Sequence, residues 1–211
     1  MHITHVFCSH QDSSVQSLLI GTHTSEDEDN FLMIADVNLP LEDSQIDPRH
    51  YDDQKSDFGG FGSSTSRVHI RKKICHDGEV NRARYMPQNT SIIATQTTST
   101  DVFIFDSSKL PDVTNTCTPL LRLKGQSKEG YGLSWNKNDQ GRLLSCSDDG
   151  KICLWDVNSE SKNGVIVPLT TFMTDGLAFE DVAWHNQHAT YFGSVGDDYK
   201  ILMYVTKSII E

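Results

Sequence analysis

The sequence predicts an all-β fold in which one unit of about fifty residues is repeated along the chain. Three segments that run from a glutamate to an aromatic residue align with one another: residues 79–85, 129–135 and 180–184. Their closing aromatic residues are 50 and 49 positions apart. A fixed period of this length, kept over three copies, indicates a repeat architecture.

A tight turn that contains an aspartate follows each aligned segment. These aspartates, Asp101, Asp149 and Asp198, are 48 and 49 residues apart. Each turn leads into a second apolar run with an aromatic residue, again at spacings of 50 and 49: Phe105, Trp155 and Tyr204. Short runs rich in valine, isoleucine and aromatic residues, bounded by Gly, Asp, Asn and Ser, are typical of strands and hairpins. Helical periodicity of useful length is absent.

Four short strands per unit, with a Trp-Asp ending at Trp155-Asp156 in one copy, are the signature of a propeller blade of the WD40 type. Two further runs, 17–21 and 31–37, predict the outer half of a first blade. We therefore expect an incomplete WD40 β-propeller of about four blades. The predicted units are a partial first blade with an acidic insert, two blades and a degenerate blade: residues 1–66, 67–110, 111–160 and 161–211.

Several of these residues are expected to be structural. A turn aspartate can accept hydrogen bonds from backbone N–H groups, and a tryptophan at a strand end can bury its ring between neighbouring blades. Only one blade-opening histidine is in place, because Gln126 and Asp175 stand at the equivalent positions. The predicted structural set is His76, Asp101, Asp149, Trp155, Asp156 and Asp198.

The chain is acidic, with a formal net charge of −11. Residues 25–57 hold eleven acids and two bases, and so carry −9 of that charge. Such a composition is typical of a solvated loop, or of a surface that attracts cationic partners. It disfavours direct nucleic-acid binding, which depends on Lys and Arg contacts to phosphates. It favours basic peptides as partners.

Nothing in the sequence indicates catalysis, a metal site or a cofactor. The five cysteines contain no C-x-x-C pair. His185 and His188 are three residues apart but lack a suitably spaced carboxylate. No nucleophile motif, phosphate-binding loop, signal peptide or membrane span is recognisable. We therefore expect a binding protein that is not an enzyme.

Five stretches carry a more specific resemblance than a generic repeat: residues 21–25, 58–62, 78–89, 128–136 and 180–185. The twelve-residue stretch 78–89 is the most specific of them. From about residue 15 to 207 the chain resembles the retinoblastoma-binding, MSI-like family of histone-binding WD-repeat proteins, of the chromatin assembly factor small-subunit type.

This resemblance implies a seven-bladed propeller in the nucleus that binds histones within chromatin assembly, remodelling or histone-modifying complexes. It also implies that basic histone tails lie on the top face of the propeller. The residues that would read the tail are Glu79, Asn81, Glu129, Tyr131 and Glu180, with Arg82 and Arg84 nearby. Carboxylates on adjacent blades can make charge-assisted hydrogen bonds to Arg and Lys. Glu180 lies four residues before its aromatic and the other two glutamates lie six, which would preserve strand parity.

Other readings stay open at the level of sequence. The glutamates can be exposed rim carboxylates with no partner, and the protein can be a generic WD-repeat scaffold or a ubiquitin-ligase adaptor. The family carries an N-terminal helix and further blades that this sequence does not show. We therefore expect a truncated form with about four of the seven blades, and a non-functional truncated paralogue is a further alternative.

Overall fold

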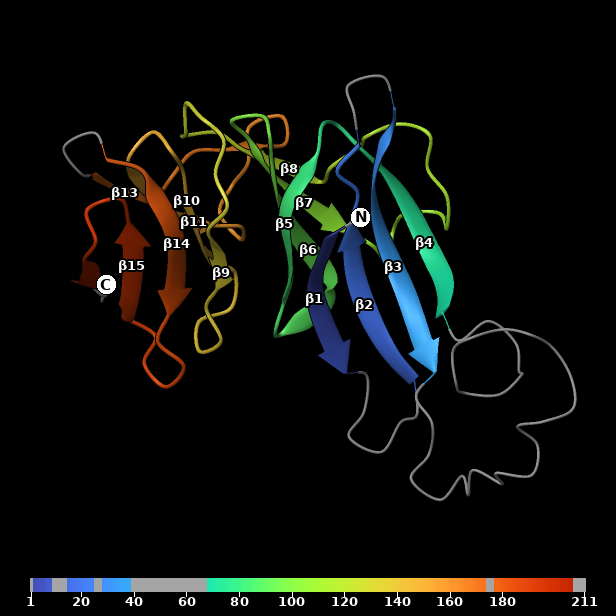
Figure 1. The fold of residues 1–211 in the computed structure, drawn as a ribbon, viewed down its shortest axis with the longest axis horizontal. Helices are drawn as coiled ribbons and strands as arrows, with labels where there is room; N and C mark the ends of the chain where they lie inside the picture. Colours follow the sequence, from blue (N-terminus) through green and yellow to red (C-terminus); the bar gives the residue numbers. More distant parts are fainter. Residues whose placement is uncertain (1, 9–14, 25–27, 39–67, 174–176, 207–211) are drawn as a thin grey trace, which may run out of the picture.

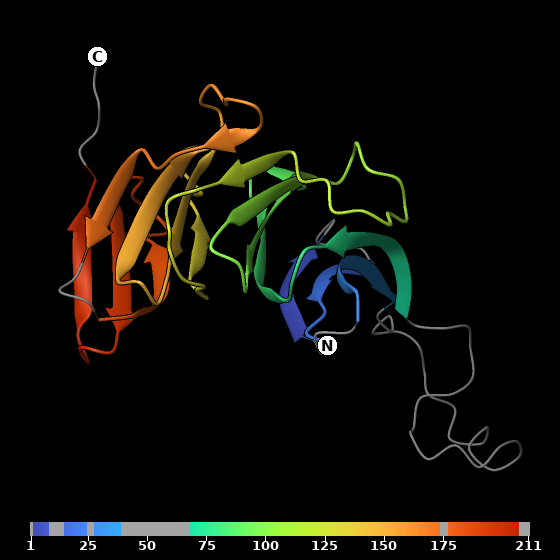
Figure 2. The ribbon, with the colours of Figure 1, turned by 90° about the horizontal axis from the view of Figure 1, so that it is seen from above.

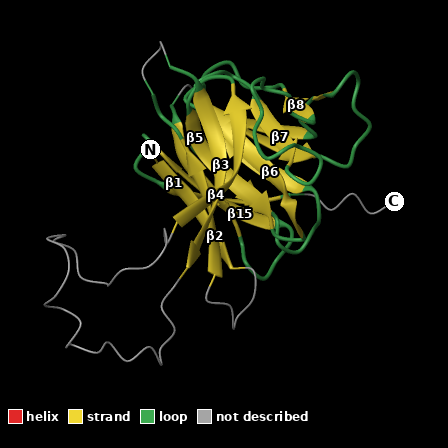
Figure 3. Cartoon of the chain, turned by 90° about the vertical axis from the view of Figure 1, so that its right-hand side faces the viewer, coloured by secondary structure: helices red, strands yellow, loops and turns green. Residues whose placement is uncertain are grey.

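The chain is built entirely from β-sheets wherever its structure is described. The computed structural model describes residues 2–8, 15–24, 28–38, 68–173 and 177–206, and the first of these ranges is described by its backbone. These residues form sixteen strands in four sheets. The sheets stand side by side along an arc, with the N-terminal sheet at one end and the C-terminal sheet at the other (Figures 1 and 2). Figure 3 shows strands and loops and no helix in the described part.

The first sheet has four antiparallel strands in sequence order. They are β1 (His2–Cys8), β2 (Val15–Gly21), β3 (Asn30–Asn38) and β4 (Val68–His76). The sequence predicted only the strands that correspond to β2 and β3, so the partial first blade is more complete than expected. Of the acidic segment 25–57, residues 25–27 and 39–57 lie outside the described residues.

A short strand that lies between two strands of the third sheet in the sequence pairs with the second sheet and joins the two. The second sheet contains β5 (Val80–Met86), β6 (Asn89–Thr97), β7 (Val102–Asp106) and β8 (Leu121–Leu123). The third contains β9 (Leu133–Trp135), β10 (Arg142–Cys146), β11 (Lys151–Asp156) and β13 (Thr170–Met173). Between the last two of these, β12 (Val165–Ile166) crosses back and pairs in parallel with β8. The pairing of β12 with β8 therefore links the two sheets at their outer edge.

The fourth sheet has three strands: β14 (Phe179–Trp184), β15 (Tyr191–Gly196) and β16 (Ile201–Val205). In β16 every second side chain is exposed, namely those of Ile201, Met203 and Val205. One face of this sheet packs on the third sheet, and the other presents apolar side chains.

The sheets are offset by one strand from the predicted sequence units. The units at 67 and 111 open with β4 and β8, and the unit at 161 opens with β12 and β13; each of these strands is an outer strand of an earlier sheet. The three remaining strands of each unit then start the next sheet from its innermost strand. Each unit therefore links two neighbouring sheets, and the division into units itself stays a prediction.

The apolar core consists of clusters between neighbouring sheets. One joins the first sheet to the second through residues such as Leu19, Ile74 and Phe103. The next joins the second sheet to the third and contains Trp155, whose side chain is 0% exposed. A third cluster, with Trp184 among its members, joins the third sheet to the fourth. Trp155 thus lies buried between the second and third sheets, the kind of position that the sequence analysis expected for it.

Hydrogen bonds explain most of the predicted structural positions. The imidazole of His76 lies between Thr95 Oγ1 and the carbonyl oxygen of Gly78, at 2.9 Å from each. The indole N–H of Trp155 donates to Ser145 Oγ at 2.9 Å. At the position of a second blade-opening histidine, the buried Nε2 of Gln126 has no hydrogen-bond partner. The glutamine therefore does not make the bridging hydrogen bonds that His76 makes in its sheet.

The turn aspartates mostly cap backbone N–H groups. Asp149 accepts from the backbone N–H of Ser127 at 2.7 Å and of Lys151 at 3.0 Å. Asp198 and Asp156 each accept one backbone N–H, at 3.0 Å. Asp101 departs from the expectation, because its carboxylate pairs with the ammonium of Lys124 at 3.6 Å.

Candidate functional site

The three predicted glutamates lie at one end of three adjacent inner strands. Glu79 immediately precedes β5, Glu129 lies on the loop that leads into β9, and Glu180 is the second residue of β14. These inner strands pack against one another in that order. The second, third and fourth sheets therefore each have one predicted glutamate on the same side, where their inner strands begin.

Tyr131 lies on the loop that leads into β9, two residues after Glu129, and it is 39% exposed. Burial raises the pKa of the phenol, and the negative charges of Glu129, Asp148, Glu79 and Glu180 raise it further. The structure places the three predicted glutamates at the same end of neighbouring inner strands, with Tyr131 on the loop of the middle sheet.

Asn81 connects two sheets within the site. Its side chain is only 7% exposed, and its amide nitrogen donates to Glu129 Oε2 at 3.1 Å and to the carbonyl oxygen of Gly130 at 3.2 Å. The amide oxygen of Asn81 is buried without a hydrogen-bond partner. Asn81 therefore orients Glu129 from below, and its burial keeps it from contacting a peptide directly.

Glu79 has a partner that the sequence did not predict. Its Oε2 lies 2.8 Å from His23 Nε2, which belongs to the loop after β2 in the first sheet. Both side chains are partly exposed. The 21–25 stretch contributed to the family resemblance, but nothing in the sequence alone placed His23 beside Glu79. With His23, all four sheets contribute a side chain to the side on which the glutamates lie.

The parity expected for Glu180 does not hold. The pairing of β14 with β15 is irregular between Phe179 and Asp181, so Glu180 occupies a bulge. A similar irregularity between Val80 and Arg82 places Asn81 in a bulge of β5. A bulge inserts an extra residue and breaks the alternation of faces. Glu180 is exposed at the opening because of this bulge.

Two further carboxylates belong to the site, Asp148 and Asp181. Burial raises the pKa of Asp148, and the neighbouring charge of Glu129 raises it further. Each carboxylate oxygen of Asp181 accepts a hydrogen bond from Arg82 Nη1 at 3.3 Å. This pair joins β14 to β5. The sequence hid Asp148 because it stands in a turn next to Asp149. Asp181 was hidden because its partner is 99 residues away.

Glycines allow the loop before β9 to pass close to its neighbours. A side chain at Gly130 would overlap the carbonyl oxygen of Cys146, and one at Gly132 would overlap the sulfur of Cys146. The same carbonyl oxygen of Cys146 accepts a hydrogen bond from Gln96 Nε2 at 2.7 Å. The predicted strand at 129–135 therefore begins only at Leu133. The loop before it holds Glu129 and Tyr131 at the opening.

Among the described residues, no group of three or more His, Cys, Asp or Glu side chains is arranged to hold a metal ion. Within the same residues no helix is long and apolar enough to cross a membrane. Cys75, Cys117, Cys146 and Cys153 are free thiols. Burial raises the pKa of Cys146 to about 12, so this thiol is protonated at neutral pH.

Comparisons with known proteins support the sequence interpretation. Residues 3–41 match a family model that describes the histone-binding protein RBBP4 and the corresponding component of the CAF1 complex. The predicted family resemblance is confirmed. The match covers β1 to β3, whereas the candidate residues from Glu79 to Glu180 lie beyond it.

The fold class is confirmed by a solved structure. The chain is similar to the β-propeller domain of Cps50 (Swd1) from Myceliophteria thermophila, with a TM-score of 0.51 and 18% sequence identity. The similarity covers 64% of this chain and 36% of that chain. At this level of identity it shows the propeller fold, and the present chain spans about a third of the length of that domain.

Proposed function

We propose that this protein binds basic peptide tails, and histone tails in particular, on the face formed by Glu79, Glu129, Tyr131 and Glu180. The observation that carries the proposal is the position of three glutamates at the same end of three neighbouring inner strands, with the partly exposed Tyr131 on the loop of the middle sheet. The family match at residues 3–41, whose description names a histone-binding protein, supports histones as the partner class.

The chemistry of the face suits an extended cationic chain. Carboxylates accept charge-assisted hydrogen bonds from Lys and Arg, which are about twice as strong as neutral ones. Glu129 is held in place by Asn81, so little side-chain freedom is lost when a ligand binds. The ring of Tyr131 offers a surface on which an alkyl stem or a guanidinium can rest. The proposed role is therefore recognition, with no chemical step.

In this proposal Asn81 positions a neighbouring side chain and does not contact the peptide. The sequence placed it among the residues that touch the tail, but it is buried and donates to Glu129 and Gly130. We assign it to positioning Glu129. Arg82 is paired with Asp181 and so adds no net charge to the face.

The family resemblance suggests the setting in which this binding would serve. We propose that the protein is a nuclear subunit of complexes that assemble, remodel or modify chromatin. The face would hold a histone tail while other subunits act on the histone.

Titration of the 211-residue chain with an unmodified basic histone tail peptide tests the proposal. We expect Glu129→Gln to weaken binding about tenfold, because it removes one charge-assisted contact. Glu160→Gln makes the same change of charge at an exposed position on the loop after β11, and it should leave the affinity unchanged. Binding should weaken as salt is raised.

Two results would contradict the proposal. One is the absence of binding at low salt by a chain that melts cooperatively. The other is an equal loss of affinity in the two variants, which would assign binding to overall charge and leave no role for the face.

A further inference from the structure

One face of the fourth sheet is open. Side chains alternate between the two faces of a strand. Val182, Phe192 and Leu202 point to the third sheet and pack in the cluster between the two sheets. The pairing of β14 with β15 and of β15 with β16 places the alternate positions side by side on the other face. The apolar residues of this open face are Ala183, Tyr191, Val195, Ile201, Met203 and Val205.

The open face is exposed and nearly without charge. Its five larger apolar side chains are between 40% and 78% exposed: Ile201, Met203, Val205, Tyr191 and Val195. Among the described positions of this face Asp181 alone is charged, and it is already paired with Arg82 at 3.3 Å. A contiguous apolar patch of this kind marks a site of protein association.

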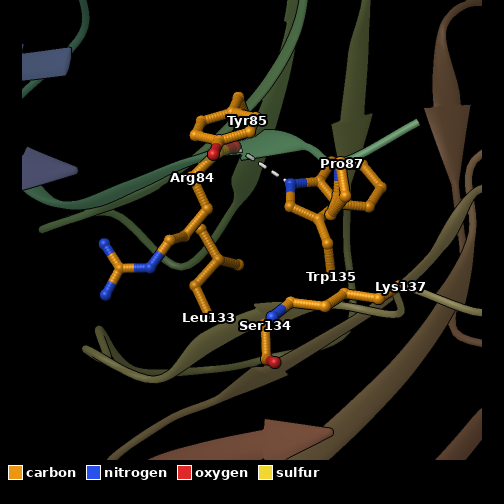
Figure 4. Close-up of a pocket in the computed structure, with 7 residues that line it drawn as sticks. All are labelled: Arg84, Tyr85, Pro87, Leu133, Ser134, Trp135 and Lys137. Atoms are coloured by element: carbon orange, nitrogen blue, oxygen red, sulfur yellow. Dashed lines mark hydrogen bonds between the residues drawn. The ribbon is translucent and has the colours of Figure 1, made fainter. Parts of the chain in front are cut away.

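Elsewhere in the arc the corresponding face is covered by another sheet. Apolar clusters join the first sheet to the second, the second to the third and the third to the fourth. Figure 4 shows part of the contact between the second and third sheets, where the indole N–H of Trp135 donates to the carbonyl oxygen of Arg84 at 2.9 Å. A cavity of about 250 Å³ remains at the end of this contact. The fourth sheet stands at the end of the arc (Figure 2), and its open face is shaped to receive a sheet in the same way.

A second copy of this chain offers a sheet that matches the open face. In a twofold dimer both copies use the same face, so apolar positions meet apolar positions and no unpaired charge is buried. Met203 can adapt to the contact, because its side chain is flexible and lies over Gly193, with its sulfur 3.2 Å from where a Cβ of that glycine would be.

The area of the open face is close to what a stable dimer needs. Its five larger side chains expose roughly 500 Å² at the fractions given above, and the rest of the face adds to this. Standard interfaces bury about 800 Å² on each partner. The face can therefore supply most of such an interface from its apolar side chains.

We propose that the open face packs against the same face of a second copy, so that two fourth sheets stack in a twofold dimer. The dimer joins two arcs at their C-terminal sheets and carries two carboxylate faces. The inference does not depend on the proposed function, because the open face shares no residue with Glu79, Glu129, Tyr131 and Glu180.

Sedimentation velocity of the 211-residue chain over a range of concentrations tests the inference. We expect a reversible dimer, and we expect Val205→Glu and Ile201→Glu each to weaken it about tenfold or more, because a carboxylate would be buried without a partner. Val167→Glu is the matched control. It makes the same change at a side chain that is 71% exposed on the loop between β12 and β13, and it should leave the dimer unchanged.

The response to salt identifies the kind of contact. Each chain has a formal net charge of −11, so two copies repel each other, and salt screens this repulsion. Added salt should therefore strengthen an apolar dimer, whereas it should weaken binding of a basic tail.

Four results would overturn the inference: a monomer at every concentration, assembly beyond the dimer, an equal loss in Val167→Glu, or a dimer that salt dissociates. The two test positions are exposed, and a cooperative melt by circular dichroism checks that each variant folds. If one of them does not fold, the other decides the outcome. Both variants should bind a basic tail peptide as the unchanged chain does, so failure here is distinguishable from failure of the proposed function.

Discussion

The hydrogen bond between Trp155 and Ser145 offers the sharpest test of how the arc is stabilised. Both residues are fully buried, and the indole N–H donates to Ser145 Oγ at 2.9 Å. Trp155→Phe removes this donor and leaves the buried hydroxyl unsatisfied, which costs about 1–3 kcal/mol. The smaller ring also leaves a cavity in the cluster between the second and third sheets, which adds about 1–2 kcal/mol. We expect the free energy of unfolding to fall by about 2–5 kcal/mol, measured by urea denaturation followed by circular dichroism.

A double-mutant cycle separates the hydrogen bond from the packing. Ser145→Ala alone leaves the indole N–H unsatisfied and is expected to cost about 1–3 kcal/mol. The double variant should lose at least about 1 kcal/mol less than the sum of the single losses, because the two residues interact directly. Additive losses, or a Trp155→Phe cost below about 1 kcal/mol, would refute the role assigned to this bond.

The remaining predictions concern the site and the pH dependence of folding. Gly130→Ala should destabilise the chain by about 2 kcal/mol or more in a urea melt and weaken tail binding, because the added methyl group overlaps the carbonyl oxygen of Cys146; unchanged stability would show that the loop moves freely. Burial lowers the pKa of His76, so folding favours its neutral form, and the melting temperature should fall as the pH drops below about 6.5; a His76→Gln variant that keeps the full pH dependence would exclude this histidine as its cause. Because the pKa of Asp148 is raised, acid protonates it at a higher pH than an ordinary aspartate, so a cationic tail should bind more weakly as the pH falls, and Asp148→Asn should flatten this dependence in peptide titrations at decreasing pH.

The two bulges are features of the site that the sequence alone could not predict. The register of Glu79, Glu129 and Glu180 with their closing aromatics predicted that all three lie on one face, and the structure has them at the same end of their inner strands. It could not show that Glu180 and Asn81 sit in bulges, because a bulge depends on how the neighbouring strand pairs. As a result Asn81, expected to touch the ligand, is buried beneath Glu129.

The sequence pattern could not predict contacts between residues far apart in the chain, for the same reason. Arg82 and Asp181 meet across 99 residues, and Trp135 reaches the carbonyl oxygen of Arg84 across 51.

The sequence by itself determined the all-β fold, the period of the repeat, the turn aspartates, the buried tryptophan and the family resemblance. Each of these depends on residues that are close along the chain, where strand alternation and turn chemistry leave a regular trace. Only the tertiary structure decided which carboxylates share one space, which polar groups are already paired, and where a cavity opens. Those properties arise from contacts between sheets, and the distances that define them are set by how the sheets pack.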